Sequence, residues 1–98
     1  MSRLDGRVAM VTGAASGIGR ASSLRLASEG AAIMCADIDL AGAEETASAI
    51  AEAGGKASAM RLDVSSSAET EDALNRTVRE LGGLDVLFNN AGVSGRGM

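Results

Sequence analysis

Three glycines in residues 12–19, TGAASGIG, have the spacing of a phosphate-binding turn between a strand and a helix. Gly13 would let the chain leave the strand in a conformation that other residues avoid, and Gly17 would let the backbone approach a bound group. Gly19 would let the helix pack closely on the strand. The N–H groups and positive dipole end of that helix would then hold an anion without a basic side chain. A turn without any ligand could need the same glycines, so both interpretations stay open at this point.

An acidic side chain follows the second apolar segment of the chain. If the anion is the pyrophosphate of a dinucleotide, Asp37 stands where a carboxylate accepts hydrogen bonds from the adenosine ribose. That carboxylate would repel a 2′-phosphate, and neither Ser16 nor Ile38 supplies the positive charge that such a phosphate needs. The pattern therefore favours NAD(H) over NADP(H). The alternative role of Asp37 is a solvated loop residue or a helix cap, although Asp39 is better placed for the cap.

The rest of the chain alternates short apolar segments with longer amphipathic ones. Apolar runs predict buried strands, and apolar residues at helical spacing predict helices that end at glycines. Ser66 and Glu69 have the spacing of a capping box, and Leu74, Val78 and Leu81 predict one apolar face for the helix behind it. The expected strands are residues 8–11, 31–36, 57–62 and 84–88, and the expected helices are residues 18–29, 40–52 and 67–81.

Strands that alternate with helices form a parallel sheet, because each helix is the crossover between neighbouring strands. Right-handed crossovers place the first two helices on one face and the third on the other, which implies the strand order 3-2-1-4. Open α/β sheets bind ligands where the strand order reverses, here between the carboxyl ends of the first and fourth strands. Residues 12–19 and 89–92 would both open there, which favours the ligand-binding interpretation of the glycine turn.

Composition excludes several other classes of protein. The 98 residues include no histidine and one cysteine, Cys35, so an internal disulfide, a histidine-based triad and a histidine-ligated metal site are all excluded. The net charge of −4 without a basic cluster argues against nucleic acid and acidic membranes as partners. No apolar run reaches membrane-spanning length, and residues 1–7 lack the apolar segment of a secretory signal. We expect a cytoplasmic protein with a buried, inert thiol at Cys35.

Three motifs resemble those of one enzyme family. Residues 12–19 resemble the TGxxxGxG cofactor motif of the short-chain dehydrogenases/reductases, and residues 89–92 resemble their NNAG motif. Asp63 and Val64 are similar to the pair that lies against the adenine. The resemblance covers essentially the whole chain and implies an α/β, Rossmann-type fold. It implies that a dinucleotide binds with its pyrophosphate against Gly13, Ser16, Gly17 and Ile18, in the motif that Gly19 completes. Asp37 would then bind the ribose, and Asp63 and Val64 would lie against the adenine. Asn90, Ala91 and Gly92 would lie beside the nicotinamide. The Asn90 side chain could instead tie the fourth strand to the first turn.

The chain departs from this family in its catalytic residues. Members transfer hydride between the nicotinamide and an alcohol or carbonyl, using a Tyr-x-x-x-Lys pair and a serine that lie beyond the NNAG strand. This chain has no tyrosine, and its one lysine, Lys56, precedes the third strand. Ser94 follows the NNAG motif too closely to be the catalytic serine of the family. No catalytic residue can be assigned. We interpret residues 1–92 as a partial NAD-binding Rossmann domain, the N-terminal part of an NAD(H)-dependent oxidoreductase, with a flexible tail at residues 93–98.

The expected sheet is incomplete. One helix would cover one whole face of four strands, and residues 85–88 would form an apolar edge that promotes aggregation. The missing half of the protein, or another chain, would complete the sheet. Two alternatives remain open: a stand-alone, non-catalytic dinucleotide-binding or regulatory module, and an S-adenosylmethionine-binding domain. Methyltransferases also pair a glycine turn with an acid after the second strand, but NNAG and the glycine spacing argue against that class.

Overall fold

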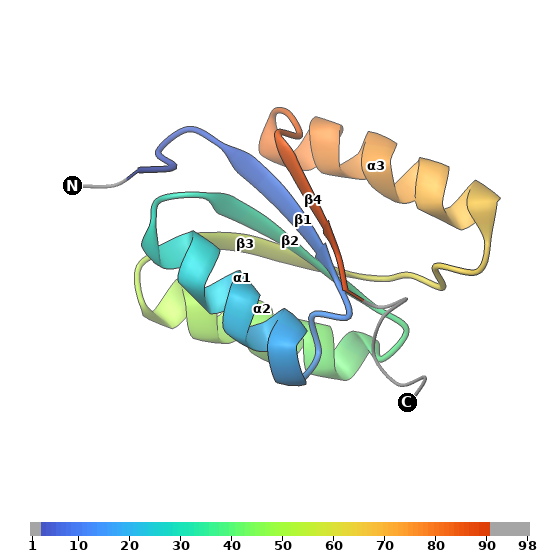
Figure 1. Cartoon of the computed structure of the whole chain (residues 1–98), viewed down its shortest axis with the longest axis horizontal. Helices are drawn as coiled ribbons and strands as arrows, with labels where there is room; N and C mark the ends of the chain where they lie inside the picture. The colour runs from blue at the N-terminus through green and yellow to red at the C-terminus, as the bar shows by residue number, and fades with distance from the viewer. Residues whose placement is uncertain (1–2, 91–98) are drawn as a thin grey trace.

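Strands and helices alternate throughout the described chain. The structure, a computed structural model, describes residues 3–90, and the elements follow one another as the sequence predicts (Figure 1). The strands are β1 (Val8–Thr12), β2 (Ala32–Asp37), β3 (Lys56–Arg61) and β4 (Val86–Asn89), and the helices are α1 (Gly17–Ser28), α2 (Leu40–Glu52) and α3 (Ser67–Leu81). Ala91, Gly92 and the tail expected at residues 93–98 lie outside the described residues.

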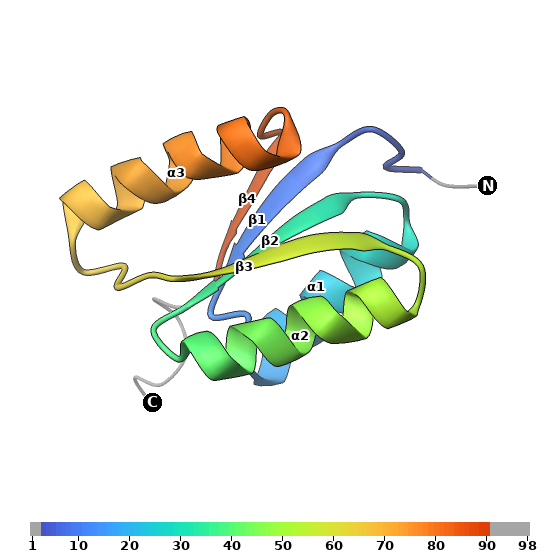
Figure 2. The same cartoon turned by 180° about the vertical axis from the view of Figure 1, so that it is seen from behind.

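All neighbouring strands pair in parallel, in the order β3-β2-β1-β4. The predicted α/β, Rossmann-type sheet with order 3-2-1-4 is therefore confirmed. Helices α1 and α2 cover one face of the sheet and α3 covers the other, as Figures 1 and 2 show from opposite sides. Thr12 pairs with Ala36 of β2 and with Asn89 of β4, so the carboxyl ends of these three strands lie together at one end of the sheet. The turn after β1 and Asn90 after β4 both follow from these carboxyl ends.

The core lies on both faces of the sheet, because successive side chains of a strand point to opposite sides. In β1, Val8 and Met10 pack in the cluster on the α3 side, whereas Ala9 and Val11 pack in the cluster on the α1 and α2 side. The cluster on the α3 side consists of alanine, valine, methionine and leucine, and the cluster on the other side is largely alanine, with Ile33, Ile50 and Phe88 among its larger side chains. Small side chains let the helices approach the sheet closely, which brings helix side chains within reach of the turns.

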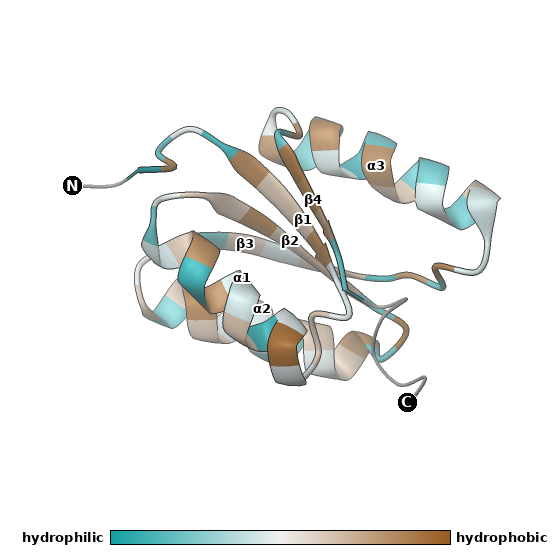
Figure 3. Cartoon of the chain, viewed as in Figure 1, coloured by the Kyte–Doolittle hydropathy of each residue, from teal (hydrophilic) through white to brown (hydrophobic). Residues whose placement is uncertain are grey.

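Strand β4 is an exposed edge of the sheet. Among the described strands it pairs with β1 alone. Figure 3 shows that most of β4 is apolar. Val86 is 39% exposed and Leu87 is 48% exposed, so the expected apolar edge is confirmed. The strand begins at Val86, two residues later than expected, and Asp85 just before it contacts the start of β1. Its carboxylate accepts a 2.8 Å hydrogen bond from the Val8 N–H, and its own N–H donates to the Val8 carbonyl at 2.8 Å.

The buried face of α3 differs from the sequence-based prediction. Val78 is 47% exposed, so the expected stripe of Leu74, Val78 and Leu81 is wrong at its middle position. Thr77 lies against the sheet instead and is fully buried together with its neighbour on the same face, Ala73. The Thr77 hydroxyl donates to the Ala73 carbonyl at 2.8 Å, which satisfies its polar group inside the apolar layer.

The caps of α2 and α3 follow the sequence only in part. Asp39 caps α2 as expected, since its carboxylate accepts from the Gly42 N–H at 3.0 Å. The Ser66 hydroxyl accepts from the Glu69 N–H at 3.2 Å, which is half of the predicted capping box. The other half is absent from the described hydrogen bonds, because the Glu69 carboxylate accepts from the Asp63 N–H at 3.1 Å instead.

Candidate functional site

Two glycines of the turn after β1 have backbone conformations that favour glycine. Gly13 has φ +69° and Gly17 has φ +58°, both in the left-handed region where a side chain causes strain. The conformational role expected for Gly13 at the end of the strand is therefore confirmed. A Cβ atom added to Gly17 would meet nothing within 4 Å, so this side of the turn faces open space. A group outside the turn can therefore approach the Gly17 backbone.

Gly19 has a different reason to be glycine. A Cβ atom at this position would lie 1.8 Å from the Gly13 carbonyl oxygen and 3.1 Å from the Ala14 Cα. No side chain fits in that space, because non-bonded carbon and oxygen atoms do not approach so closely. The first turn of α1 therefore packs directly on the glycine turn, which fixes where the N-terminus of α1 points.

The N-terminus of α1 lacks the side-chain caps that α2 and α3 have. Ser16, its N-cap, has an extended backbone and makes no side-chain capping hydrogen bond within residues 3–90, and the first turn contains no acidic residue. Next to it, Ile18 is 68% exposed. The N–H groups of the first turn and the positive end of the helix dipole therefore face the open side of the site, where an anion would be stabilised.

The carboxylate of Asp37 lies against the glycine turn. Its Oδ2 atom accepts a hydrogen bond from the Ala15 N–H at 3.0 Å, and its Oδ1 atom accepts from the Asp39 N–H at 2.9 Å. Asp37 is half-buried at the end of β2. The structure thus brings together two features that are separate in the sequence, the glycine turn and the acid after the second strand. The cap of α2 is Asp39, so Asp37 is available for another role.

A second contact on the turn was not anticipated from the sequence. The hydroxyl of Thr46, on α2, donates to the Ala14 carbonyl at 2.7 Å and accepts from the Arg20 Nε–H at 2.9 Å. Thr46 is fully buried. A threonine between Ala43 and Ile50 on the apolar face of α2 was the available signal, because a hydroxyl buried there needs partners.

The end of β4 is joined to the end of β1 by hydrogen bonds around Thr12. The Thr12 hydroxyl donates to Asn89 Oδ1 at 2.9 Å and accepts from the Asn90 N–H at 2.9 Å. Asn90 is buried. The hydrogen bond that joins Asn90 to the end of β1 is made by its main-chain N–H, whereas the bond expected from the sequence runs through its side chain. The NNAG segment begins beside the glycine turn as expected, and Ala91 and Gly92 lie outside the described residues.

Asp63 and Val64 follow β3 at the same end of the sheet. The Leu62 N–H donates to the Asp37 carbonyl at 3.0 Å, which holds this segment beside the end of β2. Hydrogen bonds from the Ser65 hydroxyl, at 2.6 Å, and from the Ser65 N–H, at 3.0 Å, lower the pKa of Asp63. Val64 is 39% exposed and lines a cavity of about 80 Å³ together with Thr12 and Asn89.

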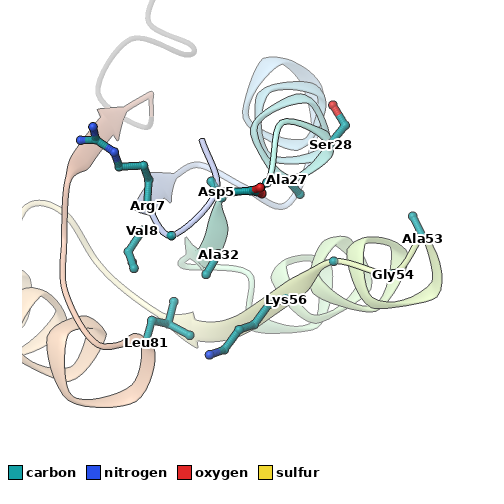
Figure 4. Close-up of a pocket in the computed structure, with 14 residues that line it drawn as sticks. Asp5, Arg7, Val8, Ala27, Ser28, Ala32, Ala53, Gly54, Lys56 and Leu81 are labelled. Atoms are coloured by element: carbon teal, nitrogen blue, oxygen red, sulfur yellow. The ribbon is translucent and has the colours of Figure 1, made fainter. Parts of the chain in front are cut away.

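A larger cavity, of about 580 Å³, lies at the opposite end of the sheet (Figure 4). Its walls include the first residues of three strands, Val8, Ala32 and Lys56. The cationic ends of Arg7 and Lys56 point away from each other, as Figure 4 shows, so they do not converge on one group. The residues that line this cavity include neither Asp37 nor any residue of the glycine turn, so it is not the site that these form. No cluster of three potential metal-ligating side chains and no helix fit to span a membrane occurs within residues 3–90.

The chain matches one family of known proteins along nearly its whole length. The sequence profile described as short chain dehydrogenase matches residues 7–98. An uncharacterized oxidoreductase of Methylorubrum extorquens is 46% identical over 94 residues, which cover 95% of this chain and 38% of that protein. This chain therefore spans well under half the length of that relative.

Solved structures give the same result. A hydroxysteroid dehydrogenase from Escherichia coli superposes with a TM-score of 0.90 at 38% identity, over 95% of this chain and 40% of that chain. A 7 alpha-hydroxysteroid dehydrogenase, complexed with NADH and 7-oxo glycochenodeoxycholic acid, superposes with a TM-score of 0.85 at 35% identity. That second match covers 87% of this chain and 33% of the other. Profile, sequence identity and superposition agree with the glycine turn and the sheet order, and this chain belongs to the short-chain dehydrogenase family.

Proposed function

We propose that this chain forms the dinucleotide-binding part of an NAD(H)-dependent oxidoreductase that interconverts alcohols and carbonyls. The observation that carries the proposal is the hydrogen bond between the Asp37 carboxylate and the Ala15 N–H. It sets an acceptor for ribose hydroxyls directly beside a turn that presents N–H donors, as adjacent ribose and pyrophosphate groups require. A related structure contains NADH, which supports the choice of ligand.

The described residues fit such a ligand. The α1 N-terminus, with Gly13, Ser16, Gly17 and Ile18 around it and Gly19 beneath, offers main-chain donors to a pyrophosphate. Each Asp37 oxygen accepts one described hydrogen bond, and a carboxylate can accept about four in total, so capacity remains for two ribose hydroxyls. Asp63 and Val64 would bound the adenine, and Asn90, with Ala91 and Gly92 after it, would lie near the nicotinamide.

The preference for NAD over NADP follows from charge. A 2′-phosphate would be placed next to the Asp37 carboxylate, and like charges at that distance disfavour binding. Ser16 is neutral, and Ile38 is 58% exposed beside Asp37 without offering a positive charge. The ribose hydroxyls of NAD would instead donate to Asp37. The selectivity therefore comes from a repulsive group as well as from an attractive one.

The chemistry of the proposed reaction is divided between the cofactor and the protein. When bound, the nicotinamide supplies the acceptor or donor of hydride. The residues of this chain bind and orient the dinucleotide. Proton transfer needs a separate acid–base group, and the single lysine of the chain, Lys56, lines the cavity at the far end of the sheet. We propose that the catalytic serine, tyrosine and lysine are supplied by residues beyond this chain. We also propose a cytoplasmic location, because a reducing compartment suits a protein with a single cysteine.

A thermal melt followed by far-UV circular dichroism tests the proposal. The purified chain is melted alone, with NAD and with NADP at equal concentrations. We expect a cooperative transition that NAD raises more than NADP does, because a ligand selective for the folded state stabilises it by mass action. Equal shifts would contradict the preference, and no shift with either would contradict the binding. Displacement of NAD by S-adenosylmethionine would favour a methyltransferase-like site, and alcohol oxidation by this chain alone would contradict the absence of catalytic groups.

A further inference from the structure

The peptide group between Ala14 and Ala15 is held on both of its sides. Its carbonyl oxygen accepts from the Thr46 hydroxyl at 2.7 Å, and its N–H donates to the Asp37 carboxylate at 3.0 Å. The N–H of Ala14 donates to the Ala36 carbonyl at 3.1 Å. Because a peptide group is planar, two partners on opposite sides fix its orientation. The residues that follow it, from Ser16 onward, present the proposed phosphate donors.

The position of the Thr46 hydrogen follows from the donors and acceptors around it. Arg20 donates from Nε at 2.9 Å, and a guanidinium cannot accept, so the hydroxyl must donate elsewhere. Two carbonyls are in range, Ala14 at 2.7 Å and Gly42 at 3.3 Å. A hydroxyl has one hydrogen, and the shorter contact is the stronger one. Arg20 therefore directs the Thr46 hydroxyl toward the glycine turn.

Arg20 itself is fixed by partners on α2. A terminal nitrogen of its guanidinium donates to the Gly42 carbonyl at 3.3 Å and pairs with Glu45 at 3.2 Å. Helix α2 and the glycine turn are close at this point, because a Cβ atom on Gly42 would lie 2.6 Å from the Ala15 Cβ. The charge of Arg20 is thus directed at α2 and partly neutralised there, so its effect on the turn passes through Thr46.

We propose that Thr46 and Arg20 are positioning residues that hold the glycine turn in the conformation that binds the dinucleotide. This inference rests on the proposed function for its ligand and on the described hydrogen bonds for its geometry. Neither residue is among those that we propose to contact the dinucleotide. Arg20 orients Thr46, Thr46 fixes the Ala14 carbonyl, and the same peptide group presents its N–H to Asp37. The ribose acceptor and the pyrophosphate seat are thereby linked through one peptide group.

The chain contains a matched control for Thr46. Thr77 is also fully buried on a helix, and its hydroxyl donates to the carbonyl four residues earlier at 2.8 Å, but it lies on the opposite face of the sheet. We would compare Thr46→Val with Thr77→Val, and use Thr46→Ser to restore the hydroxyl. The first readout is hydrogen exchange of the Ala15 amide by NMR without ligand. The second is the Kd for NAD by titration calorimetry.

We expect Thr46→Val to speed Ala15 exchange and to weaken NAD binding, each by about five- to tenfold, the range for one lost hydrogen bond. Thr77→Val should change neither quantity by as much as twofold at matched folded fraction, and Thr46→Ser should lie close to the unchanged chain. Equal effects of the two valine variants would overturn the proposal, because Thr46 would then be a stabilising residue only. Failure of Thr46→Ser to restore both quantities would overturn it as well.

Arg20→Lys covers the case in which Thr46→Val does not fold. It keeps the positive charge for Glu45 and removes the Nε donor that faces Thr46. We expect faster Ala15 exchange and weaker NAD binding in the same direction, by about two- to fivefold. Behaviour like the unchanged chain in both readouts would contradict the role of Arg20. If the unchanged chain does not bind NAD, the proposed function fails, and the exchange data still decide whether Thr46 fixes the turn.

Discussion

The carboxylate of Asp37 and the backbone N–H of Ala15 are joined by a 3.0 Å hydrogen bond. This single contact connects the end of β2 to the turn that follows β1. It also gives the acid a defined position before any ligand is present, because Asp37 Oδ1 is held by the Asp39 N–H at the same time. An acceptor with a fixed position loses less conformational entropy when a ligand binds, which favours affinity.

Removing the charge of Asp37 tests its role in ligand choice. We expect Asp37→Asn to weaken NAD binding by about tenfold or more, since hydrogen bonds to a charged group contribute about 1.5–3 kcal/mol. NADP binding should weaken less or improve, because the repulsion of the 2′-phosphate is lost. Titration calorimetry with both dinucleotides measures the ratio of the two Kd values.

Glu44→Gln is the matched control for charge, because Glu44 is an exposed carboxylate on α2. It should leave the ratio of the Kd values for NAD and NADP unchanged. A similar change of that ratio in both variants would mean that net charge, rather than the place of Asp37, sets the preference.

Gly19→Ala should damage the turn directly. Its Cβ atom would be 1.8 Å from the Gly13 carbonyl oxygen, so α1 must move away from the turn. We expect the free energy of unfolding to fall by about 2–3 kcal/mol, as for an overpacked core, and NAD binding to be lost. Urea unfolding measures the first quantity. Gly83→Ala is the control, since a Cβ there meets nothing within 4 Å, and comparable losses in both variants would refute this explanation.

The unequal caps of α1 and α3 give a stability test that needs no ligand. Ser66 accepts a hydrogen bond from the Glu69 N–H, whereas Ser16 makes no side-chain capping bond among the described residues. We expect Ser66→Ala to lower the free energy of unfolding by about 1 kcal/mol and Ser16→Ala by less than about 0.5 kcal/mol. Urea unfolding of both variants distinguishes them, and an equal loss would show that Ser16 caps α1 in solution.

The thiol of Cys35 should be unreactive in the folded chain. Its side chain is fully buried in β2, and burial raises its pKa from 9.0 to about 11 although a hydrogen bond with Ser23 opposes the shift. As pH rises, the thiol ionises in the unfolded chain before it ionises in the folded chain. Its contribution to the free energy of unfolding is therefore fully present below about pH 9 and is lost as pH rises toward about 11. Urea unfolding at pH 8 and pH 10 measures the change, and Cys35→Ala should remove this part of it. Rapid labelling by a thiol reagent at pH 8 would contradict the burial.

Much of the fold was predictable because its signals are local. Apolar runs, helical spacing and glycines at helix ends gave every element and, with right-handed crossovers, the strand order. The bounds of the strands differ from the prediction by one or two residues. Before β4, the Asp85 carboxylate accepts a hydrogen bond from the Val8 N–H, 77 residues earlier in the chain. No local sequence pattern predicts such a pair.

In the candidate site, the relative position of the motif residues was predictable from the sequence, and the contacts that support them were not. Asp37 could be identified from its place after a strand. Thr46 could not, because its contact with Ala14 spans 32 residues and depends on how closely α2 approaches the turn. Val78 was misplaced for a related reason: helical spacing identifies an apolar stripe, but only packing decides that Thr77 faces the sheet.

The anion-binding site that we propose at the start of α1 consists of main-chain N–H groups and the helix dipole, with no basic side chain in residues 12–19. Amide groups do not ionise in water at ordinary pH, and they are present whatever side chain a position carries. The affinity of this site for a phosphate group should therefore stay constant over the whole pH range in which the chain is folded. It should also tolerate replacement of Ala14 or Ile18 by other side chains of similar size, so that recognition is encoded in the path of the backbone rather than in the identity of these residues.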